Sequence, residues 1–214
     1  DVVFGATQDF DYVAMSFIQT ADDAKAMRKL MKLHGYDAKL IAKVETNAAI
    51  HNIDAIIDEV DGVMIARGDL AYEVTPEAVP VLQRKIIGLC RQKGKLSIVA
   101  TQMLASMTEN PEPTRAEVSD VATSVILQAD ALALRDETAN GKFPIEAVKM
   151  MKDLWAANIG EYLERVRIAV PAVDILVVDD GSPDGTADIA ETVARQQGGI
   201  EVLRRPGKSG LGAA

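Results

Sequence analysis

Five short apolar runs, each followed by an amphipathic stretch, constrain the fold of this chain more than any other feature. The runs show little polar alternation, as expected for parallel strands that are covered on both faces. Strands that alternate with helices predict a parallel sheet with crossover helices. The predicted strands are 12–17, 39–44, 62–66, 97–100 and 131–134. We therefore expect an α/β fold in which about five parallel strands form a partial TIM (β/α) barrel.

The stretches between the runs carry the spacing of amphipathic helices. One predicted core face consists of Val79, Leu82, Ile86 and Leu89. Cys90 lies beside that face, and we expect it to be a buried thiol rather than a reactive one. Farther along, Thr114-Arg-Ala-Glu117 has the spacing of a capping box at a helix start.

Composition excludes several classes of function. The formal charge of −9 argues against non-specific nucleic-acid binding, which needs clustered Lys and Arg. A single cysteine cannot form an intrachain disulfide or a cysteine-based zinc site. No apolar run reaches the roughly 20 residues of a membrane-spanning helix. We expect a cytoplasmic protein.

The character of the chain changes near Trp155. Beyond it the pattern predicts a helix over 158–170, a strand over 174–178, a helix over 187–197 and a strand over 200–203. We expect a partial barrel at 1–156 and a partial Rossmann-like α/β unit at 157–214.

Charged and hydroxyl side chains stand at the ends of the predicted strands. Lys43 and Glu45 are two residues apart, so both point the same way on a strand, and Asp69 and Thr101 follow later strands. The strand ends of a parallel sheet meet at one edge, so two carboxylates face one place there. Mg²⁺ takes one or two carboxylates and completes its shell with water and substrate oxygens. Ion pairing at a barrel rim is the alternative interpretation.

The identities of the residues give more information than their spacing alone. Residues 1–155 resemble pyruvate kinase, and the resemblance rests on motifs in that family's order and spacing. They are Asp11-Tyr-Val-Ala-Met-Ser-Phe-Ile, Ile41-Ala-Lys43-Val-Glu45, Asp61-Gly-Val-Met-Ile-Ala-Arg67-Gly68-Asp69-Leu, Ala100-Thr101-Gln-Met-Leu-Ala-Ser-Met and Asn110-Pro-Glu-Pro-Thr-Arg-Ala-Glu-Val-Ser-Asp-Val-Ala.

The resemblance implies transfer of a phosphoryl group between phosphoenolpyruvate and ADP, with Mg²⁺ as cofactor. It implies catalytic roles for Lys43 and Thr101 and metal ligation by Glu45 and Asp69. The implied substrate-binding residues are Ala66, Arg67, Gly68 and Thr101.

The chain also departs from that family's pattern. Ala71-Tyr72 follows Arg-Gly-Asp-Leu where a glycine is usual, and Arg135-Asp136-Glu137-Thr138 replaces Ser-Gly-Glu-Thr. The family's first three barrel strands, which carry its K⁺ site, have no counterpart here, and neither does its lid domain. We therefore expect impaired turnover.

Residues 157–214 resemble family-2 glycosyltransferases, most closely polyprenol-phosphate mannose synthases. The motifs are Asp174-Ile-Leu-Val-Val-Asp-Asp-Gly-Ser-Pro-Asp-Gly-Thr and Val202-Leu-Arg-Arg-Pro-Gly-Lys-Ser-Gly-Leu-Gly-Ala-Ala. The resemblance implies that Asp179, Asp180 and Lys208 bind a nucleotide-sugar. Asx turns and helix capping are the alternative role for these aspartates.

The sequence thus leaves three functional hypotheses. The first is a kinase-like phosphotransferase, and the second is a glycosyltransferase fragment that binds a nucleotide-sugar. The third is a non-catalytic α/β fusion whose unpaired sheet edges favour self-association.

Overall fold

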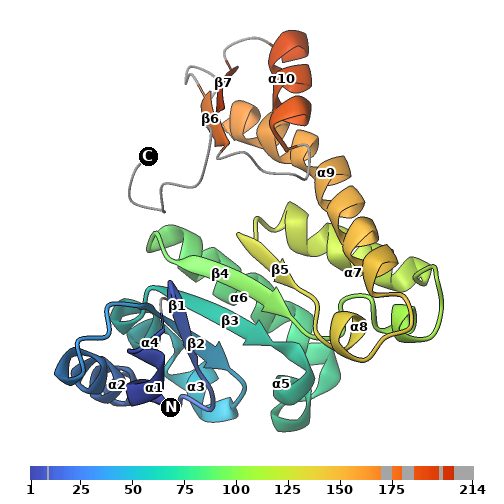
Figure 1. Ribbon diagram of the computed structural model, residues 1–214. Helices are drawn as coiled ribbons and strands as arrows, with labels where there is room; N and C mark the ends of the chain where they lie inside the picture. Colours follow the sequence, from blue (N-terminus) through green and yellow to red (C-terminus); the bar gives the residue numbers. More distant parts are fainter. Residues whose placement is uncertain (9, 170–174, 180–185, 198–199, 205–214) are drawn as a thin grey trace. The chain divides into compact units, whose positions relative to one another are not determined.

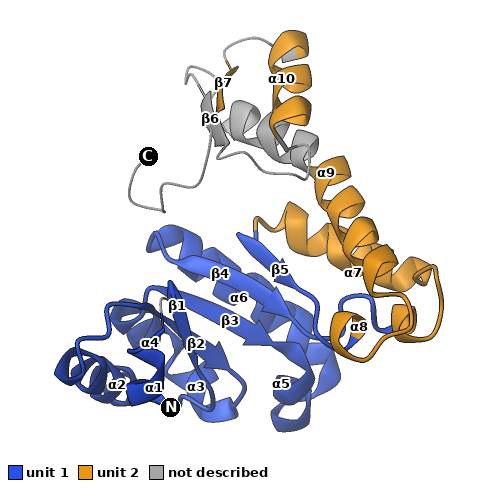
Figure 2. Ribbon diagram, in the orientation of Figure 1, with its two compact units in different colours: residues 1–105, 129–136 blue, residues 106–128, 137–214 orange. Residues whose placement is uncertain are grey.

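The structure is a computed structural model that describes residues 1–8, 10–169, 175–179, 186–197 and 200–204. For residues 159–169, 175–179, 186 and 197 it describes the backbone alone. The chain divides into two compact units (Figure 2). Residues 1–105 and 129–136 form unit 1, and residues 106–128 and 137–214 form unit 2.

Unit 1 is built on a five-stranded parallel sheet, which confirms the predicted α/β fold. Its strands are β1 (Tyr12–Met15), β2 (Lys39–Val44), β3 (Gly62–Ala66), β4 (Leu96–Ala100) and β5 (Ala131–Ala133). They lie side by side in chain order, each parallel to its neighbour (Figure 1). Five strands do not close an eight-stranded barrel, so the sheet stays open at β1 and β5.

Helices cover one face of this sheet. The helices of unit 1 are α1 (Val2–Gly5), α2 (Ala21–Leu33), α3 (Asn47–His51), α4 (Ile53–Glu59), α5 (Arg67–Glu73) and α6 (Val79–Gln92), with a 3₁₀ turn at Pro76–Ala78. Helices α2, α4 and α6 pack beside one another against the sheet (Figure 1).

The two faces of the sheet differ in burial. Ala42, Val63 and Ser97 lie in register across β2, β3 and β4, and each is at most 1% exposed. The next row, Lys43, Met64 and Ile98, points to the other face and is only half-buried. The expectation that both faces are covered was therefore wrong for this row, because the sheet does not close on itself.

Helix α6 is rotated relative to the predicted core face. Its buried residues are Val79, Gln83, Ile86, Ile87 and Cys90. Leu82 and Leu89 are half-buried instead. Cys90 is fully buried as predicted, and this burial raises the pKa of its thiol to about 12.

Unit 2 joins three helices to a small α/β segment. Its elements are α7 (Arg115–Ile126), α8 (Asp136–Ala139, which begins at the last residue of unit 1), α9 (Pro144–Ala169), β6 (Ile175–Asp179), α10 (Thr186–Gln197) and β7 (Ile200–Arg204). A 3₁₀ turn, Ala105–Thr108, starts at the last residue of the first stretch of unit 1. Strands β6 and β7 form a parallel pair, and α10 packs on β7 through Ala190, Val193 and Ile200.

The start of α7 confirms the predicted capping box. The Thr114 hydroxyl accepts from the Glu117 backbone N–H, and the Glu117 carboxylate accepts from the Thr114 backbone N–H. Glu117 also accepts from the backbone and hydroxyl of Ser106, at 2.7 and 2.5 Å. One carboxylate therefore ties the preceding 3₁₀ turn to the helix N-terminus.

Helix α9 runs for 26 residues across the position where the sequence changes character. The helix predicted over 158–170 is present over its described residues, 158–169, where it continues the preceding helix instead of forming a separate one. Gly160 is the only glycine in α9, and one glycine in a helix costs only about 1 kcal/mol. The predicted domain boundary between residues 156 and 157 falls inside this helix and stays a prediction.

Candidate functional site

The carboxyl edge of the unit 1 sheet collects the charged and hydroxyl residues predicted from the sequence. Lys43 lies near the end of β2 with Glu45 just beyond it, Arg67 opens α5 directly after β3, and Thr101 follows β4. The register pairs Val44 with Ile65 and Ala66 with Ala100, so the three strands end at the same level. The crossover topology alone brings these residues to one rim.

Lys43 and Glu45 form an ion pair at this rim, in which the carboxylate is buried and the lysine is half-buried. Lys43 Nζ lies 2.6 Å from Glu45 Oε1 and donates a 3.1 Å hydrogen bond to Ser16 Oγ. Glu45 Oε2 accepts from the Phe17 backbone N–H at 2.8 Å. The Glu45 side chain is 1% exposed, and a carboxylate this deep requires such partners. The end of β1 therefore contributes two groups that sequence patterns did not reveal.

A second pair lies at the ends of β3 and β4. The Gly68 N–H donates to Thr101 Oγ1 at 2.7 Å, and that hydroxyl donates to the Ala100 carbonyl at 2.6 Å. A Cβ at position 68 would meet Thr101 Oγ1 at 3.3 Å. The absence of a side chain at Gly68 therefore permits this close approach.

The Arg67 side chain points into the protein rather than toward solvent. It is 6% exposed, and its guanidinium donates to the carbonyls of Thr101 and Gln102. It also donates to Gln83 Oε1 at 3.4 Å. These contacts engage Arg67 with its own chain, while its predicted role in substrate binding stays a prediction.

The second predicted metal ligand, Asp69, lies in the first turn of α5 and is half-buried. Within the described residues its carboxylate forms no hydrogen bond or ion pair. No group of three or more His, Cys, Asp and Glu side chains suited to a metal occurs in the described part of the chain. Mg²⁺ needs only one or two carboxylates when water and substrate complete its shell. The donor chemistry of Glu45 and Asp69 therefore fits Mg²⁺.

The predicted nucleotide-sugar residues fall at the end of β6 and beyond. Asp179 is the last residue of β6, and its backbone is in register with Arg204. Asp180 and Lys208 lie outside the described residues. Arg204 instead pairs with Asp188 and with Glu191 Oε1, the latter at 2.7 Å. These hydrogen bonds lower the pKa of both carboxyl groups.

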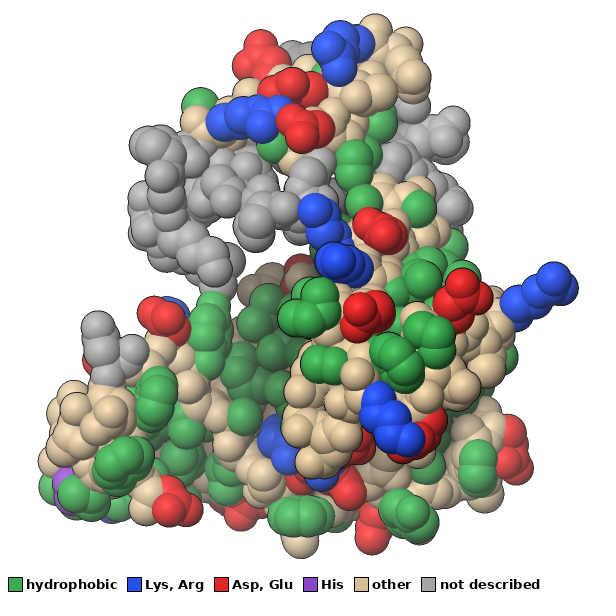
Figure 3. Space-filling model, turned by 45° about the vertical axis from the view of Figure 1, so that its right-hand side comes forward, with side chains coloured by type: hydrophobic (Ala, Val, Ile, Leu, Met, Phe, Trp, Pro, Cys, Tyr) green, Lys and Arg blue, Asp and Glu red, His purple; other side chains and the backbone are tan. Residues whose placement is uncertain are grey.

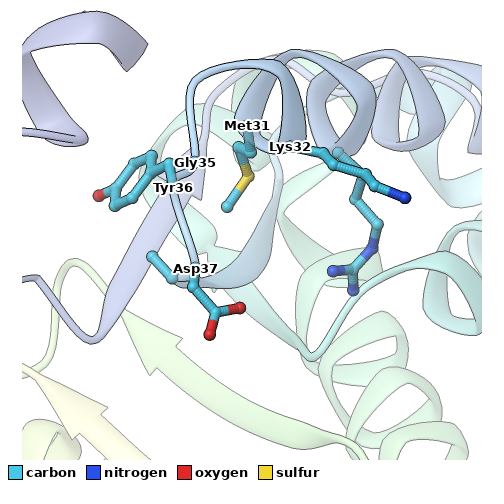
Figure 4. A pocket seen from close by; sticks show the side chains of 7 residues that line it. Met31, Lys32, Gly35, Tyr36 and Asp37 are labelled. Carbon is cyan, nitrogen blue, oxygen red and sulfur yellow. The ribbon is translucent and has the colours of Figure 1, made fainter.

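Other surface features lie away from this rim. A pocket of about 480 Å³ lies where α2 ends and β2 begins, and Met31, Lys32, Tyr36 and Asp37 contribute to its lining (Figure 4). It contains none of the predicted site residues. Acidic and basic side chains are interspersed on the face shown in Figure 3. Among the described helices, none combines the length and apolar character needed to cross a membrane.

Comparisons with known proteins divide the chain in two. Residues 1–148 match the family model described as the barrel domain of pyruvate kinase. Residues 155–214 match the family model described as glycosyl transferase family 2. The two matches confirm the resemblances to pyruvate kinase and to family-2 glycosyltransferases; the closer likeness to polyprenol-phosphate mannose synthases stays a prediction.

Curated relatives match the first part of the chain. Over 152 residues the chain is 47% identical to the pyruvate kinase of Clostridium perfringens, covering 71% of this chain and 32% of that protein. It is 45% identical over 155 residues to that of Geobacillus stearothermophilus, covering 72% and 26%. It is 40% identical over 177 residues to that of Methanocaldococcus jannaschii, covering 81% and 40%. The chain therefore spans well under half the length of these relatives.

Proposed function

Because this chain belongs to the pyruvate kinase family, we propose that its rim residues serve phosphoryl transfer between phosphoenolpyruvate and ADP. One observation carries the proposal: Lys43, paired with the buried carboxylate of Glu45, lies on the same rim as the hydrogen-bonded Gly68–Thr101 pair. The rim thus offers a cation, a carboxylate, a backbone donor and a hydroxyl. Phosphoryl transfer depends mainly on positioning and on charge stabilisation, which these groups supply.

Each group has a distinct task in this proposal. Glu45 and Asp69 would hold a Mg²⁺ ion, which when bound neutralises charge on the substrate oxygens. Lys43, on a side chain that is 25% exposed, would stabilise the phosphoryl group as it moves. The Gly68 N–H and the Thr101 hydroxyl would donate hydrogen bonds to the substrate carboxylate.

Two internal contacts must open before ligands bind. Lys43 now sits against Glu45 Oε1, so a metal at that oxygen displaces or shifts the ammonium group. The Gly68 N–H now donates to Thr101 Oγ1, so a substrate carboxylate competes with that hydroxyl. Each of these two pairs is therefore bonded within the protein, and ligands would replace those internal bonds.

The activity test is release of pyruvate from phosphoenolpyruvate and ADP by the purified 214-residue chain. We expect slow turnover that requires Mg²⁺, because the chain spans only 32% of a relative such as the Clostridium perfringens enzyme. Glu45→Gln should abolish it, whereas Glu77→Gln, an exposed glutamate, should leave it unchanged. Turnover that ignores Mg²⁺ or survives Glu45→Gln would contradict the proposal. A role in glycolysis would place the protein in the cytoplasm.

A second candidate function rests on residues 155–214 and their match to family-2 glycosyl transferases. Asp179 stands at the carboxyl end of a parallel strand, where α/β folds collect ligands. We propose that Asp179, Asp180 and Lys208 bind a nucleotide-sugar, with a GDP-sugar of the mannose-synthase type as one donor to test. Calorimetry with GDP-mannose and UDP-glucose should show binding that Asp180→Ala removes. Absence of heat with both donors would contradict this second function.

Self-association is the remaining proposal. Strands β1 and β5 are the edges of the five-stranded sheet, and unpaired strand edges favour pairing with another chain. Light scattering should show a mass above that of one 23.0 kDa chain. A monodisperse monomer at high concentration would contradict it.

A further inference from the structure

The turn after β4 holds two consecutive residues in the left-handed backbone region. Thr101 has φ 69° and Gln102 has φ 54°. L-residues other than glycine enter this region at a cost of about 1–3 kcal/mol each, and Thr is β-branched, which adds to the cost. Such a turn persists only when surrounding groups hold it, so the groups that contact it need identifying.

The buried Arg67 guanidinium forms hydrogen bonds with this turn. Its Nε and Nη2 donate to the Thr101 carbonyl at 3.1 and 2.9 Å, and Nη2 also donates to the Gln102 carbonyl at 2.7 Å. Both carbonyls belong to the two left-handed residues. Arg presents its donors in a rigid planar fork, whereas the single ammonium of Lys cannot reproduce this pattern.

Gln83 supports the guanidinium from helix α6. It is 3% exposed and accepts from Arg67 Nη1 at 3.4 Å. Gln83 is a polar residue on a helix face otherwise made of Val79, Ile86, Ile87 and Cys90. Burying an amide there is unfavourable unless it is hydrogen-bonded, so its position points to a role at the Arg67 side chain.

The held turn sets the geometry of the rim. Thr101 Oγ1 lies 2.7 Å from the N–H of Gly68, the residue directly after Arg67. Arg67 therefore influences both partners of the Gly68–Thr101 hydrogen bond. Its backbone directly precedes Gly68, and its side chain donates hydrogen bonds to the Thr101 carbonyl. A change in the turn would move the Thr101 hydroxyl away from Gly68.

We propose that Arg67 is a positioning residue, supported by Gln83, which holds the left-handed turn at Thr101 and Gln102. It thereby keeps the Thr101 hydroxyl and the Gly68 N–H side by side, so that a substrate carboxylate can accept from both in place of their mutual hydrogen bond. The substrate clause rests on the proposed kinase function, whereas the positioning clause rests on the turn alone. Arg67 acts through the loop and not through its charge on the substrate.

Hydrogen exchange of the Gly68 amide tests the positioning clause directly, because its protection reports the bond to Thr101 Oγ1. Measured by NMR on the full chain, Arg67→Lys keeps the charge but should speed exchange at Gly68 at least tenfold. Gln83→Leu should speed it about threefold, and Gln83→Glu, which keeps an acceptor, should restore most of the protection. Arg84→Met, at an exposed position on the same helix, should change nothing.

A rescue variant separates loop positioning from general packing. Glycine adopts positive φ at no steric cost, so Gln102→Gly should return Gly68 exchange in the Arg67→Lys background to within about threefold of wild type. Unchanged Gly68 protection in both Arg67→Lys and Gln83→Leu would overturn the proposal. Failure of the glycine rescue would overturn it as well.

Binding of phosphoenolpyruvate in the presence of Mn²⁺ tests the substrate clause. Its affinity should fall in the same order as Gly68 protection and recover with Gln102→Gly. If the wild-type chain binds no phosphoenolpyruvate, the proposed function and the substrate clause fail together. The exchange measurements still decide the positioning clause in that case.

Discussion

Two ionic groupings of this molecule, one at the rim of unit 1 and one in unit 2, differ in how far their charges are buried. At the unit 1 rim, Lys43 meets a Glu45 side chain that is 1% exposed. In unit 2, Arg204 meets Asp188 and Glu191, and all three side chains are at least 42% exposed. Burying a charged carboxylate costs desolvation energy, and the attraction of its counterion often does no more than offset that cost. Exposed ion pairs contribute little to stability. The comparison supports the proposal that the rim of unit 1 is the functional site.

The difference follows from the number of neighbouring strands. Glu45 directly follows the second of five strands, which β1 and β3 flank, and the residues just after β1 supply the Phe17 N–H and Ser16 Oγ. Asp179 ends a strand of a two-stranded sheet with a single strand neighbour among the described elements. Glu45 is therefore buried and hydrogen-bonded at a place that strands flank on both sides.

Removing Lys43 should give the largest effect on stability. Lys43→Met leaves Glu45 buried without its counterion, and we expect a loss of about 2–3 kcal/mol in the free energy of unfolding. Urea denaturation measures it. Lys39→Met removes an exposed lysine from the same strand and should have little effect. Equal losses of stability in the two variants would show that the partner of the buried Glu45 carboxylate contributes no more than an exposed lysine.

The same substitution should strengthen metal binding. A divalent cation no longer has to displace Lys43 from Glu45, so Lys43→Met should bind Mn²⁺ roughly tenfold more tightly, or about 1.4 kcal/mol. Calorimetry of Mn²⁺ binding measures the change, with Lys39→Met as the control for net charge. Unchanged or weaker affinity in Lys43→Met would show that Lys43 does not compete with the ion.

The Glu117 carboxyl predicts an intermediate effect that depends on pH. Burial raises the pKa of Glu117, but hydrogen bonds from Ser106 and Thr114 outweigh it and hold the pKa below its ordinary 4.5. A carboxyl group with a lowered folded-state pKa stabilises the protein above its unfolded pKa and loses that contribution as pH falls through its folded pKa.

Glu117→Gln should therefore cost about 1 kcal/mol at pH 7, the usual worth of a cap, and less below about pH 4. Urea denaturation at several pH values checks this. Glu146→Gln, at an exposed glutamate of α9, should track the wild type throughout. A stability difference for Glu117→Gln that does not change with pH would contradict the assigned hydrogen bonds.

Removing the exposed pairs should have the smallest effect. Arg204→Met breaks the contacts to both Asp188 and Glu191, yet all partners are solvated, so we expect no resolvable shift in the urea midpoint. High salt should leave the wild-type midpoint similarly unchanged. A clear destabilisation would show that exposure does not separate the two groupings.

Sequence patterns predicted the frame of unit 1 well because its strands are continuous apolar runs. Strands β2 and β3 have the predicted bounds. The Lys43–Glu45 pair follows from the spacing of two residues along one strand, and the approach of Gly68 to Thr101 follows from parallel topology. Strand β1 ends early, at Met15, because Phe17 adopts φ 54° and turns its N–H toward Glu45. No local pattern encodes that turn, since its cause lies 28 residues farther along the chain.

The parts that could not be predicted depend on tertiary contacts. Gln83 was hidden because periodicity selects apolar positions, and its burial depends on a guanidinium from another element. The change in family resemblance near Trp155 is not accompanied by a break in α9. Helix formation responds to local propensity, and residues 145–169 contain no proline.

Mn²⁺ binding to the wild-type chain and to rim variants is the most direct test of the central claim that the unit 1 rim is a metal-dependent phosphoryl site. Measured by calorimetry or electron paramagnetic resonance with phosphoenolpyruvate present, the account predicts one bound Mn²⁺ per chain. It predicts that Glu45→Gln and Asp69→Asn each abolish this binding while Glu77→Gln retains it. Binding that survives both rim substitutions, or no binding in the wild type, would contradict the account.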